Sequence, residues 1–142
     1  MTTRHPSAAA YTQSSLTTAS PQKLIVLLYE RLVLDLDRAE HALRAGDHAG
    51  RHLVHAQDII MELLTSLDVD VWDGAATLSS LYTYLHGELV TANVRRDVDR
   101  VVACRELIVP LRDAWREALA GAAVPAARTV DLAAHVPVSV TA

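Results

Sequence analysis

Apolar positions recur every three or four residues along most of the chain. This spacing is the period of an α-helix that buries one face. Four such segments follow one another, at about 21–45, 48–67, 75–95 and 98–120. No alternating pattern typical of a strand competes with them before residue 121. Because the links between the segments are short, we expect an all-α protein, an antiparallel four-helix bundle.

The inward positions of each helix are expected to form the core. In the first helix these are Ile25, Leu28, Tyr29, Leu32, Leu36, Ala39 and Leu43, and in the second Leu53, Ala56, Ile60, Leu63, Leu64 and Leu67. In the third they are Leu78, Leu81, Tyr82, Leu85, Leu89 and Ala92, and in the fourth Val101, Cys104, Ile108, Leu111, Trp115 and Leu119.

Residues that favour helix ends mark where the helices begin and stop. Ser20 followed by Pro21 is a typical N-cap with proline at the first helical position. Gly46 is placed to end the first helix in a left-handed conformation. Asp47 and Asp97 are predicted to cap the second and fourth helices.

Two segments of different composition flank the helices. Residues 1–19 are small and polar and predict a mobile N-terminal segment, followed by a bundle over residues 20–120. Residues 121–142 are low in complexity, contain two prolines and predict a disordered tail. Residues 67–74 interrupt the helical period as a longer turn. Pro110 falls on the side of the last helix away from the core and should kink it.

Composition narrows the possible environment and partners. The chain of 142 residues is most simply one domain, and its net charge of −4 argues against nucleic acid as a partner. The longest apolar run has six residues, so membrane insertion is not expected. The N-terminus lacks the apolar core of a secretory signal, and a single cysteine allows no internal disulfide. We therefore expect a cytoplasmic protein.

Candidate chemical motifs are each incomplete. The S-x-x-K pattern at Ser20–Lys23 lacks the S-D-N and K-T-G elements that its chemistry requires. The acidic residues of the turn at 67–74 resemble a calcium loop, but their spacing is wrong. Cys104 lies on the inward face with no histidine at helical spacing. We expect no enzyme activity, no catalytic residues, no cofactor and no small-molecule substrate.

Three histidines, His48, His52 and His55, share one predicted helix face. Such a set could bind zinc with a water as fourth ligand. However, no carboxylate is evident to orient the rings, and the face lies beside the core in line with Ile59. We interpret these histidines as a solvated stripe and predict no metal site, with a metal-dependent bundle as an alternative.

The first helix carries more apolar surface than one core face needs. Leu27 and Leu34 lie seven residues apart and roughly opposite the core, and Val26 and Val33 lie on one flank. On the last helix Leu107 also falls outside the main stripe, as do Val102 and Val109. Repeated apolar residues at heptad spacing suggest a groove for helices of a partner. The same pattern fits a structural or regulatory bundle that forms a homodimer, and the spacing alone leaves both open.

Several ordered motifs resemble the flagellar export chaperone (FliS) family. They are Tyr11, T-A-S-P at 18–21, K-L-I-V-L-L-Y-E at 23–30, L-x-x-L-Y-x-Y at 78–84, Ala92-Asn93 and L-R-D-A-W at 111–115. The resemblance covers about residues 11–120 in the expected order.

The resemblance implies a cytoplasmic chaperone that binds the disordered C-terminal segment of flagellin. Binding would prevent premature polymerisation and keep flagellin competent for flagellar type III secretion, with the export gate as a further partner. The predicted flagellin-binding groove contains Val26, Leu27, Val33, Leu34, Tyr84, Asn93 and Leu107. In the family the N-terminal segment, here with Tyr11 and Leu16, is an autoinhibitory contact that the client displaces.

Overall fold

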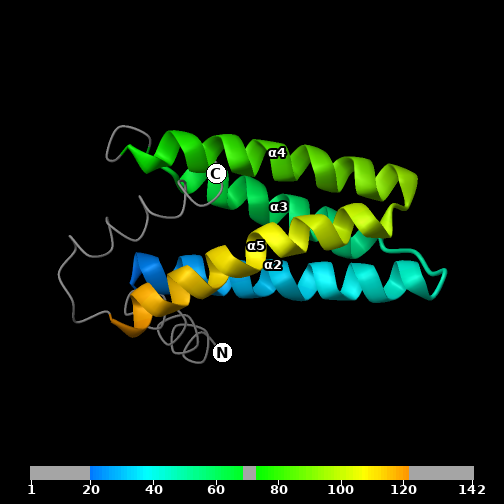
Figure 1. Cartoon of the computed structure of the whole chain (residues 1–142), viewed down its shortest axis with the longest axis horizontal. Coiled ribbons are helices and arrows are strands. Elements are labelled where there is room, and N and C mark those ends of the chain that lie inside the picture. Colours follow the sequence, from blue (N-terminus) through cyan, green and yellow to red (C-terminus); the bar gives the residue numbers. More distant parts are fainter. Residues whose placement is uncertain (1–19, 69–72, 122–142) are drawn as a thin grey trace, which may run out of the picture.

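A computed structural model describes residues 20–68 and 73–121 of the chain, which form four helices. These are α2 (Pro21–Arg44), α3 (Gly50–Ser66), α4 (Gly74–Arg95) and α5 (Val98–Ala120). Figure 1 shows them side by side along their length, with consecutive helices running in opposite directions. The predicted all-α, antiparallel four-helix bundle is confirmed. None of the described helices is long and apolar enough to cross a membrane.

The four helices occupy the corners of the bundle. Helix α2 packs against α3 and α5, and α4 packs against the same two helices, so α2 and α4 lie at opposite corners. Most of the predicted inward positions are buried, and Leu32, Leu36, Leu53, Ile60, Leu85, Leu89 and Ile108 are completely inaccessible to solvent. Ile25, Leu28, Leu43, Leu64, Leu67 and Trp115 are only partly buried at the margin of this core.

The predicted ends of α2 are confirmed. The Ser20 hydroxyl accepts a hydrogen bond of 3.1 Å from the Lys23 amide. Gly46 has a φ of 77°, which a residue without a β-carbon adopts without strain. The Asp47 amide then donates to the Ala42 carbonyl at 2.8 Å, which satisfies a carbonyl left free at the helix end.

The prediction that Asp47 caps the second helix is wrong. Helix α3 begins at Gly50 after the N-cap Ala49, and no side chain accepts a hydrogen bond there. The cause is local: Asp47 is part of the turn that closes α2, so the chain needs two more residues before it can enter a new helix. His48 is consequently outside α3.

Pro110 lies inside α5, which continues without interruption from Val98 to Ala120. Its side chain is exposed, as the pattern predicted, and the kink stays a prediction. Tyr11, Leu16, the centre of the turn before α4 and the tail beyond Gly121 lie outside the described residues, so the mobile segment and the disordered tail also stay predictions.

Candidate functional site

One flank of α2 is covered by α5. Val26 and Val33 are each only 4% exposed, so their predicted place in an open groove is wrong. Two ion pairs join this flank to α5: Glu30 with Arg116 at 2.7 Å, and Asp37 with Arg105 at 2.5 Å. Each valine lies one turn before the acidic residue of a pair, on the same side of the helix. The two valines therefore belong to the α2–α5 contact.

The outer face of α2, away from the core, is open. Leu27 is 49% exposed and Leu34 is 38% exposed, which confirms that they lie outside the core. Leu24, one turn before Leu27, is 39% exposed and extends the same apolar ridge. We call Leu24, Leu27 and Leu34 the α2 ridge. Three large exposed side chains in a row suit a contact with another apolar surface.

Beside the α2 ridge lies a buried carboxylate that the sequence analysis missed. Asp35 is 1% exposed and forms a short contact through Oδ2 with Nδ1 of His55 in α3. Arg31 Nε lies 3.3 Å from the other oxygen. A buried carboxylate requires such partners, because an isolated charge is costly away from water. Both partners are about half exposed, so this cluster ties α2 to α3 at the edge of the bundle.

The histidine stripe differs from the prediction in three ways. His55 does have a carboxylate partner, Asp35, and Ile59 on the same side of α3 is buried instead of lying near the surface. His48 lies in the turn, where its Nδ1 is 3.2 Å from Nη1 of Arg96. Among the residues that the structure describes, no group of three His, Cys, Asp or Glu could hold a metal ion.

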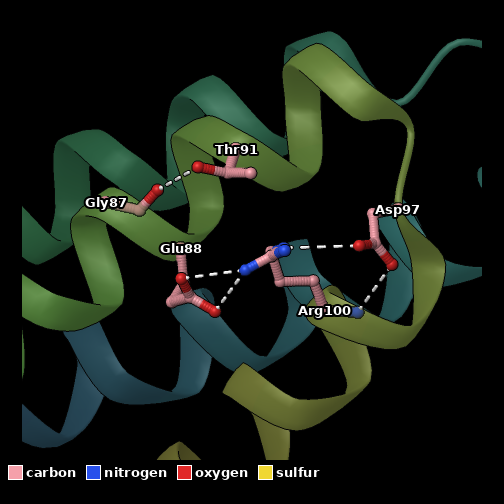
Figure 2. Close-up of polar contacts among 5 residues, drawn as sticks. All are labelled: Gly87, Glu88, Thr91, Asp97 and Arg100. Carbon is pink, nitrogen blue, oxygen red and sulfur yellow. Dashed lines mark hydrogen bonds and ion pairs between the residues drawn. The ribbon is translucent and has the colours of Figure 1, made fainter.

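A polar network joins α4 to α5. Arg100 donates to both carboxylate oxygens of Glu88, at 2.9 and 3.0 Å, and Asp97 caps α5 by accepting from the Arg100 amide at 3.1 Å (Figure 2). Hydrogen bonding to Glu88 raises the pKa of Arg100. Tyr84 lies one turn before Glu88, and Leu107 lies two turns after Arg100, so both line this seam. Tyr84 is 55% exposed and Leu107 is partly buried.

The remaining predicted groove residue, Asn93, lies apart from that seam. Its Oδ1 is 3.6 Å from the position that a β-carbon on Gly50 would take, so it packs between α4 and the start of α3. Tyr84 and Leu107 thus lie on the two helices that the Glu88–Arg100 pair joins, Leu27 and Leu34 lie on α2, the corner helix opposite α4, and Asn93 faces the start of α3.

A cavity of about 170 Å³ opens at the end of the bundle where α2 and α4 begin and α3 and α5 end. Its lining is mainly apolar and consists of Ile25, Leu63, Ser66, Leu67, Asp68, Leu78, Tyr82 and Trp115. We call it the end pocket. Periodicity assigned most of these residues to the core, so the opening among them was not predicted.

Tyr82, in the wall of the end pocket, forms a buried hydrogen bond with Tyr29. The hydroxyls of Tyr29 and Tyr82 are 2.5 Å apart, and the bond connects the diagonal helices α2 and α4. Burial raises the pKa of both phenols well above the ordinary value, so each stays neutral over the physiological range. Burial likewise raises the pKa of the Cys104 thiol to about 12, which makes it unreactive.

Comparison with known proteins gives one consistent result. The sequence model of the family described as "Flagellar protein FliS" matches residues 3–122. The chain is 30% identical over 112 residues to the flagellar secretion chaperone FliS of Bacillus subtilis, covering 78% of this chain and 84% of that protein. It is 35% identical over 111 residues to the protein of the same name from Campylobacter jejuni, covering 76% and 87%. The corresponding Escherichia coli protein is 32% identical over 111 residues, covering 75% and 82%. This chain therefore belongs to the FliS family of flagellar secretion chaperones, which are not enzymes.

Proposed function

We propose that this chaperone binds the disordered C-terminal segment of flagellin in the cytoplasm. Binding keeps flagellin from polymerising before export and presents it, still unfolded, to the gate of the flagellar type III secretion system. The protein's role in flagellar export follows from its family. The nature of the client and the surface that it uses are the proposal.

The observation that carries the proposal is the exposed apolar surface of the bundle. Among the residues that the structure describes, eight large apolar side chains are at least 38% exposed: Leu24, Leu27 and Leu34 on α2, Val54 and Met61 on α3, and Tyr84, Val90 and Val94 on α4. They belong to three helices, two of them at opposite corners of the bundle. No single short helix could contact all of them, whereas a long flexible chain can wrap around the bundle.

A wrapped client is also what the energetics require. A disordered segment loses conformational entropy when it docks, so it needs a larger contact than the ~1,600 Å² of a standard interface. We assign the α2 ridge, Tyr84 and Leu107 to this contact, with Asn93 at its margin. The N-terminal segment covers the α2 ridge through Tyr11 and Leu16 until the client displaces it.

Calorimetry with a peptide of the last ~40 residues of flagellin from the same organism tests this proposal. We expect a 1:1 complex with a large negative heat-capacity change, because binding buries apolar surface. Replacing Leu27 and Leu34 together by Asp should raise Kd at least ~100-fold, since two apolar contacts of about 1.5 kcal/mol each are lost. Deleting residues 1–16 should lower Kd.

Arg51→Asp is the matched control, because it changes the net charge by the same two units at an exposed site on α3. It should leave Kd unchanged. Absence of heat at several temperatures, together with a stable dimer in sedimentation, would instead support the homodimer, with the α2 ridge as its interface.

A further inference from the structure

We infer that the chain's own C-terminal segment, residues 122–142, docks in the end pocket. Val130 and Leu132 supply the side chains that fill it. The contact itself does not depend on what the client is. Its consequence, competition with flagellin at this end of the bundle, rests on the proposed function.

The end pocket is suited to an aliphatic side chain. Its volume is about 170 Å³, and an apolar cavity of about 150 Å³ accepts a benzene-sized group. Leu63, Leu78 and Trp115 contribute apolar walls from three different helices. An open pocket of this kind leaves apolar surface in water, so any tethered apolar group within reach is favoured to cover it.

The described part of the chain ends near this pocket. Helix α5 ends at Ala120, and Trp115 lies six residues before Gly121, or about 9 Å along the helix axis. Pro125 lacks an amide hydrogen and disfavours helix in the residue before it, so α5 cannot simply be extended. Val130 lies nine positions after Gly121, a span of up to about 30 Å, which is ample to turn back to the pocket.

The composition of the segment fits the pocket. Its only charged residues are Arg128 and Asp131, and its only leucine is Leu132. Val130 and Leu132 are two residues apart, so in an extended conformation they point to the same side. A segment of this composition has no core of its own, yet it can bind a ready-made apolar surface.

Tethering makes even a weak contact effective. A short flexible linker holds its end at an effective concentration on the order of 1 mM. An intrinsic Kd of about 100 µM would therefore keep the pocket about 90% occupied, and a client that needs the pocket would bind about tenfold more weakly. The family match ends at residue 122, so this inhibition by the C-terminal segment is a feature of this chain beyond the part that it shares with the family.

Quenching of Trp115 fluorescence by acrylamide in the full-length Trp72→Phe protein tests the contact. Val130→Asp with Leu132→Asp should raise the quenching constant of Trp115 about twofold, because a carboxylate does not enter an apolar pocket. Ser139→Asp with Thr141→Asp, two polar positions of the same segment, is the control with equal charge and should change nothing. An unchanged constant in the first variant overturns the inference. So does an increase caused only by Leu16→Asp, which would make the N-terminal segment the occupant.

A spin label on the C-terminal segment tests independently where this segment lies. Ala133→Cys provides a reactive thiol beside Leu132, and the buried Cys104 does not compete for the label. The label should broaden the amide signals of Leu67 and Leu78 more than that of Val94, and the Val130→Asp, Leu132→Asp changes should abolish the difference. Equal broadening with and without these changes would contradict docking.

Calorimetry separates this inference from the proposed function. If both hold and the bound client also enters the end pocket, the Val130→Asp, Leu132→Asp protein binds the flagellin peptide about tenfold more tightly than the unchanged protein. Equal binding with a raised quenching constant shows that the segment docks and that the client does not use the pocket. If the quenching constant rises but no peptide binds, the proposed function fails and the docking stands. If peptide binds both proteins equally and quenching is unchanged, only the docking fails.

Discussion

Val33 and Leu34 are adjacent in sequence, yet the structure predicts opposite responses to the same substitution. Val33 is 4% exposed against α5, whereas Leu34 is 38% exposed on the α2 ridge. Asp at position 33 would lie three residues after Glu30 and four before Asp37, on the same side of the helix. Asp at position 34 would instead lie between Arg31 and Arg38 at the same spacings.

The loss in free energy of unfolding for each substitution follows from the burial of the side chain that is replaced. Val33→Asp loses about 1.5 kcal/mol or more of apolar burial and places a carboxylate in the core, at a further cost of several kcal/mol. The sum, about 5 kcal/mol, equals the whole stability of a marginal domain, so this protein should be largely unfolded at 25 °C. Leu34→Asp should cost only about 1 kcal/mol, mainly through lower helix propensity.

Urea unfolding followed by circular dichroism at 222 nm measures both effects. Val33→Ala serves as the milder companion and should cost about 2 kcal/mol, which lowers Tm by roughly 8–16 °C for a domain of this size. The reasoning would be refuted if Leu34→Asp proved as destabilising as Val33→Asp. The reasoning would also be refuted if Val33→Ala left the stability unchanged and weakened flagellin binding, because Val33 would then contact the client and not α5.

Three further outcomes follow from particular contacts. Burial raises the pKa of Tyr29 and Tyr82 above the value of about 10 that they have in the unfolded chain. Their contribution to the free energy of unfolding is therefore complete below pH 10 and is lost as pH rises above it. The loss is up to ~2.7 kcal/mol per pH unit for the two tyrosines together. Urea unfolding at pH 8 to 11 should show this loss, and a Tyr82→Phe protein should show about half the slope; a flat profile would contradict the burial of both phenols. His55→Ala should cost about 2 kcal/mol in thermal unfolding by leaving Asp35 buried with one partner fewer, and adding Asp35→Asn should restore part of it. Equal stability with and without His55 would show that the contact between His55 and Asp35 does not stabilise the fold. Arg96 adopts a φ of 53° while its guanidinium donates to the carbonyls of the α2–α3 turn, so Arg96→Ala should be less stable than Arg96→Gly by about 1 kcal/mol in urea unfolding, because only glycine removes the strain. The reverse order would mean that the left-handed backbone is not strained.

Much of the fold could be read from local chemistry. Helical period and cap residues depend on neighbours within one or two turns, so the sequence predicted four helices and an N-cap at Asp97 that the structure confirms. Where two local signals competed, the prediction failed. Asp47 is a good cap residue, but closure of α2 at Gly46 engaged its amide first.

The open surface depended on contacts between helices. Periodicity fixes the angle between Val33 and Leu34 on α2, but it does not say which flank a neighbouring helix will cover. The α2–α5 ion pairs show that α5 packs over Val26 and Val33, and this leaves Leu27 and Leu34 to the solvent. Asp35 could not be recognised as buried for the same reason, since its partner His55 comes from another helix.

The sequence by itself determined the helices, most of their ends, the residues of the core and the family to which the chain belongs. Only the tertiary structure decided which apolar residues remain exposed and where the bundle stays open. The end pocket illustrates the difference, because its walls come from the ends of four helices. Most of the wall residues look like core positions when each helix is considered alone, and the space between them exists only once all four helices are packed together.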